Sequence, residues 1–241
     1  MSYDLDRIYG NSAAAAPVSA RAAFIKRTYL HLAGAVIAFV GIEAVLFSTN
    51  MAEQIIKDVF LANRLAWIGL MVLFIAGGYG AQYLARSRQS IGVQYMGLAL
   101  YVLLEVVIFL PLLYISMNPQ FGGSLKLPMQ AGIVTLAVFG GLTVAVFVSG
   151  KDFSFMGPIL WAGSFLALGL VIAAVAFGFS LGLVFCGAMV ALAAGFIIYD
   201  TSNIMHRYGT NEHVAASLEL FASVALLFYY ILRIFYLSRN D

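Results

Sequence analysis

Charged residues and cysteine are scarce in this sequence. Only 10% of its 241 residues are charged and 63% are hydrophobic, whereas an ordinary soluble domain carries about 25% charged residues. The single cysteine, Cys186, excludes an internal disulfide. The formal net charge of +2 provides no basic surface for a nucleic acid. This composition excludes a soluble globular protein and indicates a membrane protein.

Recognisable catalytic and metal-binding motifs are also missing. The sequence contains no HExxH motif, no phosphate-binding glycine loop and no nucleophile elbow. Its three histidines, His31, His206 and His213, do not follow the spacing of metal ligands. We therefore expect no enzymatic activity, no cofactor and no metal site.

Seven apolar stretches separated by short polar breaks dominate the chain. A helix that crosses the bilayer needs about 20 apolar residues, and the stretches cover residues 29–47, 65–85, 91–115, 130–149, 157–179, 181–199 and 214–237. Only the glycine-containing break at 178–182 separates the fifth from the sixth. The sequence predicts an all-α domain of seven transmembrane helices over residues 28–238. Residues 1–27, which include an alanine run and Pro17 with nothing to pack against, are expected to form a flexible cytoplasmic tail.

Basic residues are distributed unequally between the two sides of the predicted spans. With the N-terminus in the cytoplasm, the cytoplasmic side carries Arg7, Arg21, Lys26, Arg27, Arg86, Arg88, Lys151 and Arg207. The external side carries Lys57, Arg64, Lys126 and Arg239. Because cytoplasmic loops are enriched in lysine and arginine, this bias predicts a cytoplasmic N-terminus and an external C-terminus.

Four carboxylates lie within or at the ends of the predicted spans, where a charge costs about 2.5–3.5 kcal/mol on insertion scales. They are Glu43, Glu105, Asp200 and Glu219, and Arg233 lies in the last span. With the predicted topology, Asp200 and Glu219 both fall in the cytoplasmic half. Two neighbouring carboxylates compete for protons, so the two residues are candidates for a proton-sensitive gate or a cation site. Alternatively, each carboxylate only bonds to a neighbouring helix or reaches the interface.

Several segments resemble the Bax inhibitor-1 (transmembrane Bax inhibitor motif) family. The segment IIYDTSNIMH at 197–206, with AASLEL at 215–220 and ILRIF at 231–235, is similar to the signature region of that family. The loop KDFSFMG at 151–157 and the basic residues Arg86 and Arg88 are similar to the corresponding parts. The resemblance covers about residues 20–238. Within the family, the segment that begins at Asp200 is most similar to the bacterial YccA-like branch, whose members modulate the FtsH membrane protease.

The resemblance implies a seven-helix fold in which six helices surround the last. It also implies a role for particular residues, because calcium-leak members use a pH-sensitive pair of aspartates. Asp200 matches the first aspartate, whereas Ser223 stands at the position of the second. Arg86 matches a basic position that pairs with this site. Since a serine cannot form a carboxylate pair, Glu219, one helical turn before Ser223, is the alternative second carboxylate.

Two functions remain open at this point. The first is an interaction protein of the bacterial inner membrane that modulates, or is handled by, an FtsH-type AAA protease, with residues 1–27 as the segment that the protease engages. The second is a pH-sensitive leak for calcium or protons, through a cavity lined by Asp200, Glu219 and Glu105. The missing second aspartate favours the first. Membrane lipid is an expected partner of either.

Overall fold

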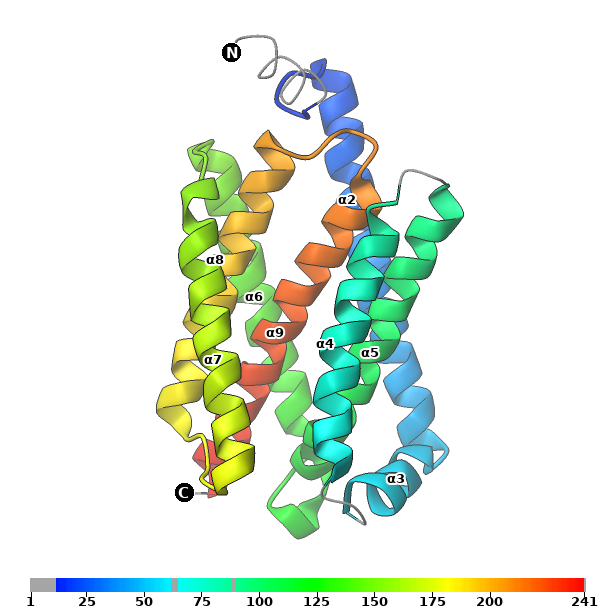
Figure 1. The fold of residues 1–241 in the computed structure, drawn as a ribbon, viewed down its shortest axis with the longest axis vertical. Coiled ribbons are helices and arrows are strands. Elements are labelled where there is room, and N and C mark those ends of the chain that lie inside the picture. Colours follow the sequence, from blue (N-terminus) through cyan, green and yellow to red (C-terminus); the bar gives the residue numbers. More distant parts are fainter. Residues whose placement is uncertain (1–11, 62–64, 88–89, 241) are drawn as a thin grey trace. The chain divides into compact units, whose positions relative to one another are not determined.

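The computed structural model describes residues 12–61, 65–87 and 90–240, which are helical with no β-strand among them (Figure 1). The all-α prediction is therefore confirmed for this part of the chain. The long helices are α2 (Val18–Ser48), α4 (Leu65–Ala85), α5 (Ile91–Met117), α6 (Lys126–Ser149), α7 (Gly157–Phe177), α8 (Leu183–His206) and α9 (His213–Asn240). The short elements are α3 (Met51–Ile55), η1 (Ile56–Leu61), η2 (Pro119–Phe121) and η3 (Ser154–Met156).

Each predicted span coincides with one of the long helices. Within the described residues, six of these helices are long and apolar enough to cross a membrane, and the described part of α4 contributes the shorter apolar stretch Gly69–Ala85. The fifth and sixth predicted spans are separate helices, because α7 ends at Phe177 and the next residue, Gly178, has a φ of 76°, which suits a residue without a side chain. The structure thus has six candidate spans, and a seventh crossing by α4 stays a prediction.

The first helix begins earlier than the sequence analysis placed it. Helix α2 starts at Val18, directly after Pro17, so residues 18–27 belong to a helix and not to a structureless tail. Phe24 of this helix is buried, and the expectation that the alanine run has nothing to pack against is wrong at Ala13, which is fully buried. Residues 1–11 lie outside the described part of the chain. Ala13 donates a backbone hydrogen bond to the carbonyl of Tyr208 at 2.7 Å.

The chain divides into two compact units, which share the predicted domain of residues 28–238. The unit formed by Pro17–Ile115 and Gly209–Phe221 contains α2, α3, η1, α4, α5 and the first part of α9. Its interior is aromatic: the ring of Phe39 lies 5.0 Å from Phe109 and 6.3 Å from Phe221. Helices α4 and α5 approach closely at Gly97, where a Cβ atom would lie 2.5 Å from the carbonyl oxygen of Ala81. We call this the α2–α5 unit.

The other unit consists of Met1–Ala16, Ser116–Tyr208 and Ala222–Asp241, and contains η2, α6, η3, α7, α8 and the rest of α9. Its interior includes Cys186 and Met189 of α8 packed with Tyr230 of α9. Helices α7 and α8 approach at Gly195, where a Cβ atom would lie 2.6 Å from the Leu160 side chain. We call this the α6–α8 unit.

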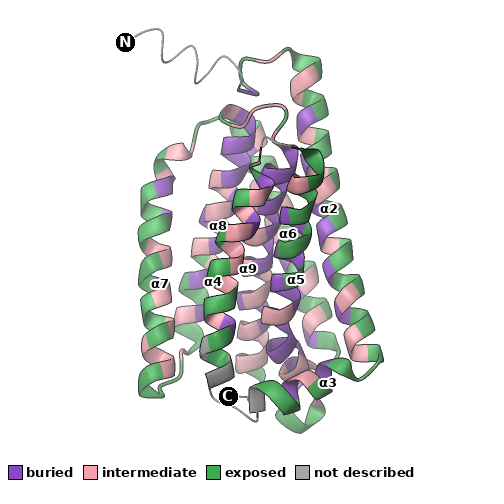
Figure 2. Ribbon diagram, turned by 45° about the vertical axis from the view of Figure 1, so that its right-hand side comes forward, coloured by how far each residue is buried: buried purple, intermediate pink, exposed green. Residues whose placement is uncertain are grey.

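Helix α9 takes part in both units and is buried in each. Half of its most apolar window (50%) is buried, against 11% for α7, and Figure 2 shows this contrast between the two helices. Such burial is required of a last helix surrounded by others, as the resemblance implies. Its enclosure by six helices stays a prediction, since the two units are described separately.

Candidate functional site

A buried carboxylate–hydroxyl pair joins α8 to α9 in the α6–α8 unit. Asp200 lies in the last two turns of α8 and is 4% exposed, and Ser223 of α9 is 5% exposed. The Ser223 hydroxyl donates a hydrogen bond to Oδ2 of Asp200 at 2.5 Å. This distance lies at the short end of the range for a hydrogen bond from a hydroxyl to a carboxyl oxygen. The structure thus brings together the two positions that the family resemblance pairs.

The end of α8 holds the loop between α6 and α7. The Ser202 hydroxyl accepts a hydrogen bond from the backbone N–H of Phe153 at 2.8 Å, and Arg207 donates to the hydroxyl of Ser154 at 2.5 Å. A Cβ atom on Gly157 would lie 3.1 Å from the Tyr199 ring, so the first turn of α7 packs tightly against α8. The two segments that resemble the family signature, 151–157 and 197–206, are therefore in contact.

One carboxylate of this loop lies outside the membrane-spanning helices. Oδ1 of Asp152 accepts a hydrogen bond from the backbone N–H of Ser154 at 2.9 Å. That bond is the main cause that holds the pKa of Asp152 below its usual range, with a smaller contribution from the positive charge of Arg207. Asp152 is therefore ionised at neutral pH and fixes the turn that precedes η3.

An ion pair lies in the α2–α5 unit. Arg86, which directly follows α4, donates a hydrogen bond to Oε1 of Glu219 in the first part of α9. The Arg86 side chain is 59% exposed and that of Glu219 is 17% exposed. The resemblance implies that Arg86 pairs with the aspartate site, and the contact described here is with Glu219. The second basic residue of the resemblance, Arg88, lies outside the described residues.

Asp200 and Glu219 thus each have a polar partner of their own. Glu219 precedes Ser223 by one turn on α9, as the helical spacing requires. The two carboxylates belong to different units, so a direct pairing of Asp200 with Glu219 stays a prediction.

The two remaining carboxylates of the predicted spans are buried in the α2–α5 unit. Glu105 of α5 is 4% exposed and forms a hydrogen bond with Tyr101, one turn earlier on the same helix. Glu43 of α2 is 5% exposed, and neither of its carboxyl oxygens has a hydrogen-bond partner among the described residues. The alternative that each carboxylate bonds to a neighbouring helix therefore fits neither residue, since Glu105 bonds within its own helix. Arg233, the cation of the last span, donates to the carbonyl of Leu181 at 3.2 Å.

A histidine cluster in the α2–α5 unit escaped the sequence analysis. Nε2 of His31 lies 2.7 Å from the hydroxyl of Tyr95, and the His31 ring lies 4.9 Å from that of His213. No pattern in the sequence predicts this cluster, because its members lie on three different helices far apart in the chain. In the part of the chain that the structure describes, no group of three or more His, Cys, Asp or Glu residues could hold a metal ion.

The chemistry available to these polar groups is proton exchange and hydrogen bonding. The carboxyl group of Asp200 accepts the hydrogen bond of Ser223, and the carboxylate of Glu219 attracts the guanidinium of Arg86. Each contact joins α9 to a different part of the structure, namely the end of α8 and the end of α4. Both contacts therefore attach α9 to another helix of the unit in which each contact lies.

Comparisons with known proteins agree with the resemblance. The family model described as "Inhibitor of apoptosis-promoting Bax1" matches residues 21–240. The chain is 30% identical to protein lifeguard 4 of Mus musculus over 234 residues, which cover 96% of this chain and 92% of that protein. It is 28% identical to the Golgi anti-apoptotic protein of Vaccinia virus (strain Lister) over 250 residues, 99% of this chain and 95% of that protein.

A third relative matches only in part. The chain is 40% identical to a BI1-like protein of Arabidopsis thaliana over 123 residues, which cover 45% of this chain and 44% of that protein. These matches do not single out the YccA-like branch. The extent of the family-model match and the full-length match to the mouse protein establish the broader assignment: this chain is a helical membrane protein that belongs to the Bax inhibitor-1 family.

Proposed function

We propose that this chain is a regulatory membrane protein that acts through a protein partner. The partner is an FtsH-type membrane AAA protease. The chain either modulates this protease or is handled by it. The observation that carries the proposal is the bond between Ser223 and Asp200. In calcium-leak members of the family, the resemblance implies an aspartate where this chain has Ser223. A hydroxyl satisfies Asp200 without sharing its proton, so the pair lacks the second carboxylate of the leak mechanism.

A role in protein interactions needs no such pair. Helix α7 exposes large apolar side chains, among them Ile159, Phe165 and Leu166, which suit contact with lipid or with the transmembrane helix of a partner. The viral relatives are named anti-apoptotic proteins, and from that name we carry over only a regulatory role. The similarity of the segment that begins at Asp200 to the YccA-like branch points to the protease as the partner.

A protease that pulls its substrates from the cytosol must engage a chain end. Because α2 begins at Val18 and Ala13 is bonded to Tyr208, residues 13–27 do not suit this role, and the deletion that tests it is confined to the part of the expected tail outside the described residues. Deletion of residues 2–11 should therefore lengthen the lifetime of the protein in cells that contain the protease, and should leave membrane insertion unchanged. A pulse-chase measurement in protease-positive and protease-negative cells tests this. An equal lifetime of both forms in protease-positive cells contradicts the role of this segment.

A pH-sensitive calcium or proton leak is the second candidate. It is favoured by the ion pair between Arg86 and Glu219, because a carboxylate–guanidinium contact at the end of α4 is of the kind that protonation releases. Purified protein in calcium-loaded liposomes distinguishes the two functions when flux is measured at pH 5 and pH 7. The proposal predicts no pH-dependent flux for the native chain and its appearance in Ser223→Asp, which restores the carboxylate pair. Flux in the native chain that Glu219→Gln changes would instead establish the leak.

We further propose that the protein resides in a bacterial inner membrane with its N-terminus in the cytoplasm and its C-terminus outside. The excess of basic residues on the predicted cytoplasmic side supports this orientation. A reporter fused at residue 1 should be active only in the cytoplasm, and one fused after residue 241 only outside. Cytoplasmic activity at both ends would mean an even number of crossings and would remove one of the seven predicted spans.

A further inference from the structure

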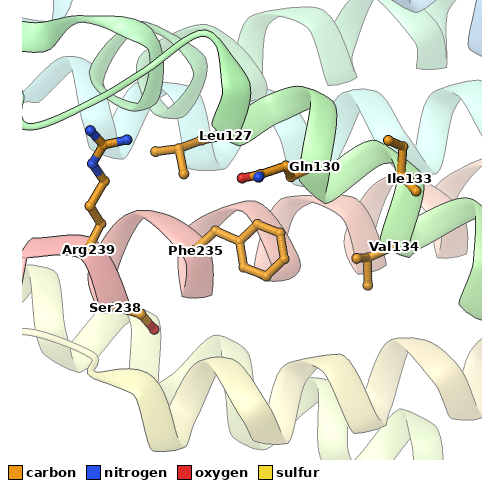
Figure 3. Close-up of a pocket in the computed structure, with 7 residues that line it drawn as sticks. All are labelled: Leu127, Gln130, Ile133, Val134, Phe235, Ser238 and Arg239. Atoms are coloured by element: carbon orange, nitrogen blue, oxygen red, sulfur yellow. The ribbon is translucent and has the colours of Figure 1, made fainter.

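A groove lies between the start of α6 and the end of α9, within the α6–α8 unit (Figure 3). Its volume is about 480 Å³, which falls within the range of small-molecule sites. Two hydrogen bonds hold the end of α9 that forms one wall. Tyr236 donates to the carbonyl of Phe121 at 3.0 Å, and Arg233 donates to that of Leu181 at 3.2 Å. The groove is therefore framed by segments that the rest of the unit fixes.

The lining of the groove changes from charged to apolar along its length. Figure 3 shows Arg239 and Ser238 at one end, Phe235 and Gln130 in the middle, and Ile133 and Val134 at the other end. Arg239 lies in the last turn of α9, so the charged end is at the end of a candidate membrane span and the apolar end lies deeper. The polarity of the groove thus follows the polarity of the bilayer.

The charges near the groove favour an anionic occupant. Among the described residues, Arg239 forms no ion pair or hydrogen bond, and Lys126 begins α6 directly before Leu127, which lines the groove. The acidic side chains described in this unit are Asp152 and Asp200, and neither lines the groove; the other acidic residues of the unit, Asp4, Asp6 and Asp241, lie outside the described residues. Basic pockets between transmembrane helices on the cytoplasmic side of membranes bind anionic lipid headgroups, and a basic side chain at the external end of α9 offers the same charge pairing to a headgroup of the outer leaflet.

We propose that this groove binds one anionic phospholipid, with the phosphate of the headgroup at Arg239 and an acyl chain along Phe235 and Val134. Arginine presents several N–H donors in a plane and therefore binds phosphate oxygens in pairs. Ser238 and Gln130 supply further hydrogen-bonding groups for the glycerol and ester region. The acyl chain of the lipid covers apolar surface of Phe235, Ile133 and Val134 that would otherwise be exposed.

Native mass spectrometry of the full-length protein in detergent, after removal of copurified lipid, tests the proposal. Phosphatidylglycerol or phosphatidylcholine is added at equal concentration, and the bound fraction is counted. We expect phosphatidylglycerol to be retained about fivefold better, which is the effect of one basic side chain at an anionic headgroup. Equal retention of the two lipids would mean unselective contact with bulk lipid and would overturn the proposal.

Three variants identify the groove as the site. Arg239→Gln should abolish the headgroup preference and Arg239→Lys should retain part of it. The matched control is Lys151→Gln, which removes an exposed charge from a different loop of the same unit and should keep the full preference. Val134→Phe, which fills the apolar end, should reduce retention of both lipids. Circular dichroism of each variant confirms folding, since an arginine in the last turn also stabilises the helix.

Contrary outcomes are equally distinct. If Arg239→Gln keeps the full headgroup preference, as Lys151→Gln should, the headgroup is not bound at Arg239. If Val134→Phe does not change lipid retention, no acyl chain lies in the groove. Inorganic phosphate at millimolar concentration is added in a further arm. Displacement of phosphatidylglycerol by phosphate would mean a site for a free anion, and would overturn the assignment to a lipid.

Discussion

Replacement of Ser223 by alanine is the most informative test of the buried pair. The bond from Ser223 to Asp200 is 2.5 Å long and nearly inaccessible to solvent on both sides. A hydrogen bond to a charged group contributes about 1.5–3 kcal/mol in soluble proteins, whereas hydrogen bonds between membrane helices average about 0.6 kcal/mol with a maximum near 1.7. A short bond to a carboxylate belongs at the upper end of that membrane range. We therefore expect Ser223→Ala to lower the free energy of unfolding by about 1.5 kcal/mol.

The control is a second buried serine on the same helix. The Ser217 hydroxyl is fully buried and donates to the backbone carbonyl of Val214 at 2.7 Å. Ser217→Ala removes the same atom but leaves a neutral acceptor, so it should cost less, about 0.5 kcal/mol. Unfolding of the purified variants in mixed micelles of dodecyl maltoside and sodium dodecyl sulfate, followed by circular dichroism, measures both values.

A double-mutant cycle isolates the contribution of the pair itself. In the cycle of Asp200→Asn and Ser223→Ala, the coupling free energy should reach about 1 kcal/mol, because only the native pair combines the donor with a charged acceptor. A coupling below about 0.3 kcal/mol, or equal losses in Ser223→Ala and Ser217→Ala, would refute the reasoning. The hydrogen bond would then contribute no more than any serine on α9.

Three further predictions concern the rest of the chain. Glu43→Leu should raise the free energy of unfolding by about 1–3 kcal/mol, because it removes a buried carboxyl group that has no partner among the described residues. Destabilisation of this variant in the same micelle assay would mean that the carboxyl group has a partner. Gly97→Ala should lower stability by about 1–3 kcal/mol, since the new Cβ atom meets the backbone of α4 at 2.5 Å. The control Gly92→Ala, which meets only a flexible side-chain atom at 3.8 Å, should be tolerated, and similar losses in both would contradict the close approach. The lowered pKa of Asp152 stabilises the folded state above the unfolded pKa of about 4. This contribution is lost as the pH falls below 4, so the native chain should lose more stability than Asp152→Asn between pH 5 and pH 3. If the free energies of unfolding of the two forms change in parallel with pH, the bond to Ser154 contributes nothing.

The positions of the helices followed from the sequence because the hydrocarbon core imposes a local rule. A backbone in lipid must satisfy its hydrogen bonds within one segment, so each crossing appears as one continuous apolar run. Helix α4 accordingly has the predicted bounds of residues 65–85. The break that ends α7 was also readable, because glycine at 178 and 182 marks a chain turn. Before residue 29 the segment is too polar to be predicted as part of a span, and the structure alone shows that residues 18–27 belong to α2 and that Phe24 is buried.

The partners of the buried polar groups were decided by the tertiary structure. The sequence, through the family resemblance, placed Asp200 and Ser223 in one site, and the hydrogen bond between them agrees with it. It could not assign Arg86 to Glu219, 133 residues away, nor show that Glu43 is buried without a partner among the described residues. Hydrophobic periodicity reports only which face of a helix is apolar. Which polar side chain lies opposite another depends on how helices distant in the chain are placed, and that placement is the outcome of side-chain packing between them.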